Sequence, residues 1–152
     1  FNARFDAISR SYRYKCVLEK DPFNIHTVLH LYRNPDVEHM NEAAKLLLEA
    51  RDFASFCKSG GQNKTTICDV KEAYWIAEDR KIEFIITADR FLRNMVRAVV
   101  GTLLDVGYGK TDITGFAEIM KQKNRSSAGK SVAARGLYLE QVRYNWSEHR
   151  TS

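Results

Sequence analysis

The chain has few cysteines, and no pair of them stands at a spacing typical of a disulfide framework or a zinc site. The three, Cys16, Cys57 and Cys68, are widely separated and odd in number, and the four histidines do not group into a ligand pattern. Cysteines that are few, widely spaced and odd in number are typical of proteins whose thiols stay reduced inside the cell. We therefore expect a cytoplasmic protein with neither disulfides nor a bound metal.

A hydrophobic run of transmembrane length is also missing, and the first residues do not resemble a signal peptide. The formal net charge of +5 is compatible with an RNA or phosphate partner without establishing one. With 152 residues and 44% hydrophobic content, the chain can form one compact domain, which we place at 1–147, followed by a tail at 148–152. Because it begins at Phe1 without a methionine and at once enters a segment that looks structured, we expect it to be part of a longer protein.

The order of periodic segments predicts an α+β domain, with an antiparallel sheet and helices packed on one face. The strands expected from alternation are 10–19, 26–32, 69–77, 81–88 and 136–144. The helices expected from their spacing are 35–50, 89–107 and 111–123. We expect Asn34 to cap the first helix, Pro35 to open it, and Thr111 or Asp112 to cap the third. The predicted buried stripe of the first helix is Val37, Met40, Ala44, Leu47 and Leu48.

Residues 89–107 (DRFLRNMVRAVVGTLLDVG) predict a helix whose one polar stripe carries no negative charge. The stripe consists of Arg90, Arg93, Asn94, Arg97 and Gly101. Asp89 is a possible partner for Arg93, whereas Arg97 has no acidic residue three or four positions away. A buried, unpaired arginine would cost on the order of 3–5 kcal/mol. The counter-charge of Arg97 is therefore expected from elsewhere in the fold, from a missing part of the protein, or from a bound anion.

Two interpretations of this stripe remain. It can be a solvated basic edge of a surface helix, because runs of charge usually face water. Alternatively, a glycine beside arginines suits the close approach of another backbone or of a ligand. Glycine inside a helix costs roughly 1 kcal/mol relative to alanine, which favours the second interpretation.

Four segments, in this order, resemble the carboxy-terminal half of the TruA-type tRNA pseudouridine synthases. They are FNARFDAISRSYRY at 1–14, DFASF at 52–56, FLRNMVRAVVGTLLDVG at 91–107 and AGKSVAARGLYLEQVRY at 128–144. The resemblance implies an isomerase that converts uridines of the tRNA anticodon arm (positions 38–40) to pseudouridine. It also implies a homodimer that binds tRNA across both subunits and uses no metal or cofactor.

The family's catalytic aspartate lies in a G-R-T-D-x-G-V motif of the amino-terminal half, and this motif is absent from the chain. The run Gly109-Lys110-Thr111-Asp112 is similar, but it follows the arginine helix, has lysine for arginine and lacks the trailing Gly-Val. Asp112 is better explained as a helix cap. We therefore expect the chain to be inactive alone, with the aspartate supplied from upstream.

The resemblance gives roles to three residues. Arg97, in N-M-V-R, matches the arginine that pairs with the catalytic aspartate, so the isolated chain is expected to leave it exposed or paired with an anion. Tyr12 matches the tyrosine that stacks on the target uracil, and Leu137, in G-L-Y-L, matches an apolar residue of the uridine pocket. Residues that could contact tRNA phosphates are Arg90, Arg93, Lys58, Lys64 and Lys130.

Each assignment has a plainer alternative. Arg10, Tyr12 and Tyr14 share one strand face, so a flipped base could stack there, but ordinary half-buried aromatics fit the same pattern. Leu137 could equally belong to the core, and the basic residues could be merely solvated. For the chain as a whole, the alternatives are a non-catalytic RNA-binding module derived from such an enzyme and a structural domain that dimerises.

Overall fold

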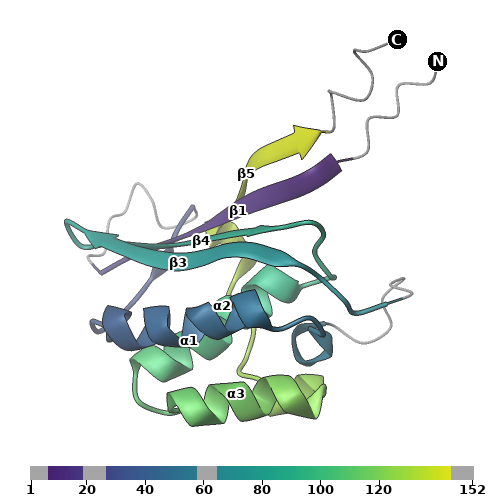
Figure 1. The fold of residues 1–152 in the computed structure, drawn as a ribbon. Coiled ribbons are helices and arrows are strands. Elements are labelled where there is room, and N and C mark those ends of the chain that lie inside the picture. The colour runs from purple at the N-terminus through teal and green to yellow at the C-terminus, as the bar shows by residue number, and fades with distance from the viewer. Residues whose placement is uncertain (1–6, 19–26, 58–64, 145–152) are drawn as a thin grey trace.

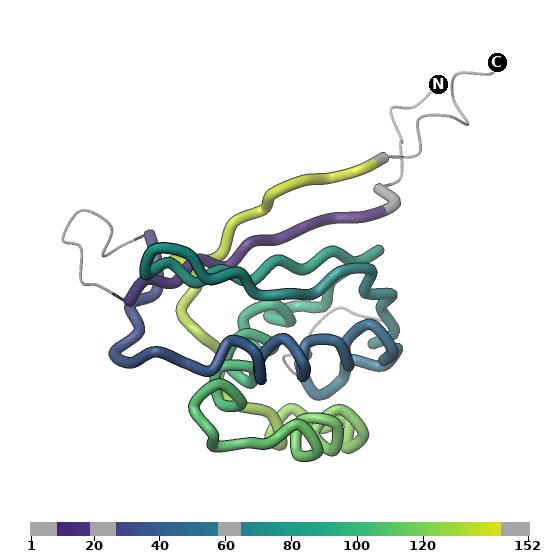
Figure 2. Tube along the Cα trace, turned by 60° about the vertical axis from the view of Figure 1, so that its left-hand side comes forward, coloured from purple at the N-terminus to yellow at the C-terminus, as the bar shows by residue number. Residues whose placement is uncertain are grey.

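Three helices lie on one side of a five-stranded sheet in the computed structural model, which describes residues 7–18, 27–57 and 65–144 (Figure 1). The strands are β1 (Ala7–Val17), β2 (Leu29–His30), β3 (Val70–Glu78), β4 (Lys81–Ala88) and β5 (Leu137–Tyr144). The helices are α1 (Val37–Glu49), α2 (Met95–Gly107) and α3 (Ile113–Gln122). α3 packs on the other two helices, away from the sheet (Figures 1 and 2). The predicted fold class is confirmed.

The sheet is organised around β1. β4 pairs with one edge of β1, and β3 pairs with β4 in the predicted hairpin. The other edge of β1 is shared by β5 and β2. All of these pairs are antiparallel except that of β2, which runs parallel to β1 over Cys16–Leu29 and Val17–His30. The prediction of a wholly antiparallel sheet was wrong there. Residues 18–28 separate the two strands in the chain, which is close to the dozen or so residues that a parallel crossover needs.

The helices cover the face of the sheet made by alternate residues of β1 and β4. Tyr14 lies opposite Phe84, and both side chains are completely buried. Tyr12 follows on the same face, opposite Ile86, but is only half-buried. The predicted face of β1 is therefore correct, and Tyr12 lies on it where part of the ring stays exposed.

α1 begins later than predicted, because its cap is Asp36 and not Asn34. The Asp36 Oδ1 atom accepts a hydrogen bond from the His39 backbone amide at 3.1 Å. Pro35 is buried and precedes this cap. The buried stripe is Met40, Ala43, Ala44 and Leu47. Leu48, which the prediction included, stands one residue beyond this stripe and is 42% exposed.

α2 also begins later than predicted, at Met95 and not at Asp89. Asn94, the residue before the helix, has a φ of +67°. This left-handed conformation prevents the helix from extending back toward Asp89. Asp89 and Arg93 are therefore not one helical turn apart. Asp89 Oδ1 accepts from the Asp69 amide at 2.8 Å instead, and Arg93 forms no ion pair within the described ranges.

Gly101 lies directly under another stretch of backbone. A Cβ atom built on Gly101 would stand 1.8 Å from the carbonyl oxygen of Lys130 and 3.6 Å from the Cα of Ser131. Residues 128–133, which we call the covering segment, therefore cross α2 at a distance that glycine alone allows. The expected close approach of a backbone to this helix is confirmed.

We predict that Gly101→Ala lowers the free energy of unfolding by about 1–3 kcal/mol, because the added methyl group displaces the covering segment. An unobstructed Gly→Ala change inside a helix would instead raise the free energy of unfolding by roughly 1 kcal/mol. The sign of the measured change therefore distinguishes an obstructed position from an open one. Urea denaturation followed by circular dichroism measures it. Thr114→Ala, at an exposed position of α3, is the control and should stay within about 0.5 kcal/mol of the parent. A Gly101→Ala protein at least as stable as the parent would contradict the packing described.

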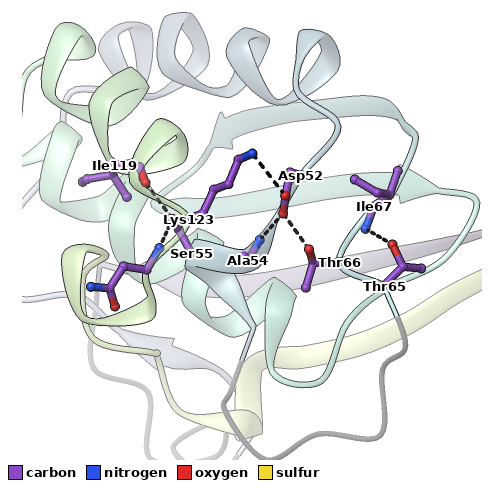
Figure 3. A network of polar contacts seen from close by, with 9 residues as sticks. Asp52, Ala54, Ser55, Thr65, Thr66, Ile67, Ile119 and Lys123 are labelled. Atoms are coloured by element: carbon purple, nitrogen blue, oxygen red, sulfur yellow. Dashed lines mark hydrogen bonds and ion pairs between the residues drawn. The ribbon is translucent and has the colours of Figure 1, made fainter.

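Asp52 joins the segment after α1 to the segment before β3 (Figure 3). Its Oδ1 atom accepts from the Ala54 amide at 3.0 Å and from the Thr66 hydroxyl at 2.6 Å, and the Lys123 ammonium lies 3.6 Å from Oδ2. Burial alone would raise the pKa of Asp52. The hydrogen bonds and the Lys123 charge outweigh burial, and the pKa of Asp52 falls below its usual 3.8.

A carboxyl group whose pKa is lower in the folded state stabilises the protein above its ordinary pKa and loses this effect in acid. We therefore predict that Asp52→Asn costs on the order of 1 kcal/mol at pH 7, and that the difference shrinks as the pH falls from 4 to 2. Urea denaturation of both proteins across this range provides the measurement. Glu118→Gln, exposed on α3, should show a difference near zero throughout. A deficit for Asp52→Asn that is constant with pH would show that the charge is not involved.

Candidate functional site

A pocket of about 280 Å³ opens where β1, the turn before α2 and the start of β5 meet. Its walls include Tyr12, Arg97 and Leu137, so the structure brings together the three residues to which the resemblance assigned roles. They come from three elements that are far apart in the chain. The volume is just below the roughly 300–1,000 Å³ range of small-molecule sites, so the pocket suits a small ligand.

Tyr12 and Phe91 form the aromatic wall of the pocket. Their rings meet edge to face, with centroids 4.9 Å apart and planes at 86°. This contact fixes the orientation of the Tyr12 ring. Because Tyr12 and Leu137 are both only half-buried, an aromatic ring and an aliphatic side chain remain available to a planar base.

Arg97 is held by the backbone of the covering segment. Its Nε atom donates to the Val132 carbonyl oxygen at 2.8 Å, and the Val132 amide donates back to the Arg97 carbonyl at 3.1 Å. In the part of the chain that the structure describes, the two terminal nitrogens have no acceptor and no carboxylate pairs with them. Arg97 is thus half-buried and anchored to the backbone, and it is not the exposed side chain that was one of the two expectations. The terminal nitrogens could bind both oxygens of a carboxylate.

Tyr14 supports the covering segment from the sheet. Its hydroxyl donates to the Ala133 carbonyl at 2.5 Å, and burial raises the pKa of Tyr14 well above its usual value, so the phenol keeps its proton. Gly136 makes room for this contact. A Cβ atom there would lie 2.8 Å from the Tyr14 ring and from the Lys15 carbonyl oxygen. The glycine of G-L-Y-L is therefore required by packing.

The residues predicted to contact phosphates do not all reach the pocket. Arg93 is exposed and lines it, with no partner among the described residues. Lys130 is exposed on the covering segment but is not part of the pocket wall. Lys58 and Lys64 lie outside the described residues.

Arg90 has a structural use. Its Nη1 atom donates to the carbonyl oxygens of Thr65 at 3.0 Å and of Ile67 at 2.9 Å, and Arg90 is not part of the pocket wall. It therefore ties the segment before β3 to the turn before α2. This contact could not be foreseen from the stripe, because Arg90 precedes the true start of the helix.

Asp112 is a helix cap, as predicted. It precedes α3, and its Oδ1 atom accepts from the Gly115 amide at 2.6 Å. It does not line the pocket. The similarity of Gly109-Lys110-Thr111-Asp112 to a catalytic motif is thus explained by a local capping requirement.

Sequence reasoning missed three parts of the site: the Phe91 ring, the turn at Asn94 and the Val132 carbonyl. Phe91 and Asn94 were noticed only as members of an apolar arc and a polar stripe. A backbone carbonyl has no signature in the sequence.

A larger hollow, of about 510 Å³, lies at the β3–β4 turn. Both signs of charge line it, with Arg33 and Lys81 beside Glu78 and Asp79, and none of the predicted site residues is there. Within the described ranges, no group of three metal-ligating side chains is close enough to hold an ion. No described helix has both the length and the apolar character needed to cross a membrane.

The chain matches the tRNA pseudouridine synthase family over residues 43–145, more than half of its length, and it belongs to that family. It is 52% identical to the tRNA pseudouridine synthase A of Porphyromonas gingivalis over 145 residues, which are 94% of this chain and 58% of the relative. The protein of the same name from Parabacteroides distasonis is 48% identical over 94% of this chain and 57% of the relative. The protein of this name from Bacteroides thetaiotaomicron is 47% identical over 94% of this chain and 54% of the relative. The resemblance found in the sequence is confirmed, and the chain spans a little over half the length of these relatives.

Proposed function

We propose that this chain is the carboxy-terminal, uridine-binding half of a tRNA pseudouridine synthase, acting on uridines of the anticodon arm at positions 38–40. One observation carries the proposal. Tyr12, Arg97 and Leu137 line a single pocket, and the terminal nitrogens of Arg97 face no acidic partner within the described part of the chain. A stacking surface and a cation that lacks its carboxylate are what a base-binding half-site needs.

In this proposal the target uridine leaves its helix, and its base stacks on Tyr12 with Leu137 against its apolar edge. The bond between N1 of the base and C1′ of the ribose breaks, and a bond between C5 and C1′ forms. The proton on C5 goes to solvent and N1 gains one, so the reaction is an isomerisation.

The catalytic aspartate is proposed to come from a G-R-T-D motif outside this sequence. Paired with Arg97, its carboxylate would be kept ionised and oriented, because a nearby guanidinium lowers the pKa of a carboxyl group. Arg93 and Lys130 are proposed to contact tRNA phosphates. We further propose that the whole protein acts in the cytoplasm as a homodimer that binds tRNA across its subunits.

Tritium release from tRNA labelled at uridine C5 tests this function. We would compare this chain with a version extended upstream through its native coding sequence. Release by the extended protein alone supports the proposal. Release by this chain alone would show that an acid within it has been overlooked. Salt-sensitive tRNA binding without release from either protein would support the RNA-binding module instead.

In the extended protein, we predict that Arg97→Lys lowers kcat by about 100-fold or more, because lysine cannot bind both carboxylate oxygens and the Val132 carbonyl together. Tritium release under saturating tRNA measures kcat, and an unchanged melting temperature shows that the fold is kept. Arg51→Lys, at an exposed arginine outside the pocket, is the matched control. Unchanged turnover of a folded Arg97→Lys protein would remove Arg97 from the mechanism.

Tyr12→Leu should likewise abolish tritium release but leave tRNA affinity within about threefold of the parent, because phosphate contacts dominate binding. Filter binding at fixed salt measures the affinity. Tyr74→Leu, on the opposite face of the sheet, should change neither quantity. Parallel losses of affinity and turnover in Tyr12→Leu would place Tyr12 in general tRNA binding.

A further inference from the structure

We propose that Arg125 and Ser131 are positioning residues, which fix the guanidinium of Arg97 by setting the shape of the covering segment. The catalytic consequence of this proposal rests on the proposed function, whereas its structural part can be tested in this chain alone. Neither residue lines the pocket, so any effect on chemistry there passes through another group.

Arg125 holds the covering segment at two points. It begins a single turn of 3₁₀ helix (Arg125–Ser127) after α3 and is half-buried. Its Nη1 atom donates to the Gly129 carbonyl oxygen at 2.9 Å, and its Nη2 atom donates to Ser131 Oγ at 2.8 Å. The rigid, planar guanidinium therefore sets the spacing between residues 129 and 131. A lysine, with one flexible ammonium group, cannot do this.

Ser131 connects this arginine to the start of α2. Its Oγ atom also accepts from Asn94 Nδ2 at 2.6 Å, so both acceptor sites of the hydroxyl oxygen are used. Asn94 is the left-handed residue that precedes the helix, and it lines the pocket. One hydroxyl oxygen thus joins Arg125, the covering segment and the pocket wall.

The next residue, Val132, transmits this constraint to Arg97. Its carbonyl oxygen is the acceptor that Arg97 Nε uses, and no other acceptor for the guanidinium lies within the described ranges. The orientation of Arg97 therefore follows the orientation of the Val132 peptide. That orientation depends on how residues 129 and 131 are held.

Loss of Arg125 should loosen this arrangement without unfolding the segment. Other ties remain. The Gly129 amide donates to Thr102 Oγ1 at 3.0 Å, and Lys130 packs on Gly101. The Val132 amide donates to the Arg97 carbonyl at 3.1 Å, and the Tyr14 hydroxyl donates to the Ala133 carbonyl at 2.5 Å. The expected result is a shift at Val132 and Arg97 within a folded domain. A displacement of about 1 Å at a catalytic group can cost about 100-fold in rate.

The first experiment measures tritium release by the extended protein. We expect Arg125→Ala and Arg125→Lys each to lower kcat by about 10- to 100-fold, with KM for tRNA within about threefold of the parent. Ser131→Ala should lower kcat in the same way, whereas Ser131→Thr, which keeps the hydroxyl, should restore it. Lys121→Ala and Ser126→Ala are exposed neighbours that should leave both constants unchanged. Parental kcat in Arg125→Ala would overturn the proposal.

The second experiment uses this chain alone and follows the exchange of the Arg97 Nε proton by ¹⁵N NMR, with the resonance assigned by its absence in Arg97→Lys. We expect exchange to accelerate about tenfold or more in Arg125→Ala and Ser131→Ala, and to be unchanged in Ser126→Ala. Unaltered exchange in Arg125→Ala would overturn the proposal whatever the activity. An extended parent protein without tritium release would count against the proposed function only, since this exchange measurement does not depend on it.

Discussion

The close packing of the covering segment on the middle of α2 is the constraint on which the rest of the site depends. Without a side chain at Gly101, the Lys130 carbonyl can lie against the helix. The following peptides then reach two separate supports, the Arg97 side chain and the Tyr14 hydroxyl. A single turn of 3₁₀ helix (Ala134–Gly136) connects the segment to β5, so the same contact helps to place Leu137 beside β1. The absence of one methyl group thus bears on two walls of the pocket, Arg97 and Leu137.

The architecture could be predicted from the sequence wherever a pattern repeats over several residues. The bounds of β4 match the predicted strand at 81–88, α3 falls within the predicted helix at 111–123, and Asp112 caps α3 through a bond to a residue three positions away. The true starts of α1 and α2 could not be predicted in this way. Asn94 adopts its left-handed conformation beside a hydrogen bond to Ser131, a residue distant in the chain. The parallel pairing of β2 was likewise not predictable, because alternation within a strand does not record the direction of its neighbour.

Among the three candidate site residues, only Arg97 was singled out by its own surroundings in the sequence, whereas Tyr12 and Leu137 were assigned roles by the resemblance. Arg97 stood out because it had no acid within a helical turn, and the structure keeps its terminal nitrogens without a partner among the described residues. Arg90 carries the same charge on the same predicted stripe, yet it holds two backbone carbonyls. Charge alone could not distinguish these two arginines. The two arginines differ because α2 begins between them, so that Arg97 lies within the helix and Arg90 lies in the turn before it.

Tyr12 and Leu137 stand near opposite ends of the chain, and they meet because β5 pairs with β1. This pairing has a consequence for the order of folding. The β3–β4 hairpin and the adjacent helices form from neighbours in the sequence, but the pocket requires the closure of a loop that contains nearly the whole domain. On the ribosome, a nascent chain that ended before β5 would have its aromatic wall and its arginine helix but no enclosed site. The pocket is therefore incomplete until β5, the last strand of the described residues, has been synthesised and has paired with β1.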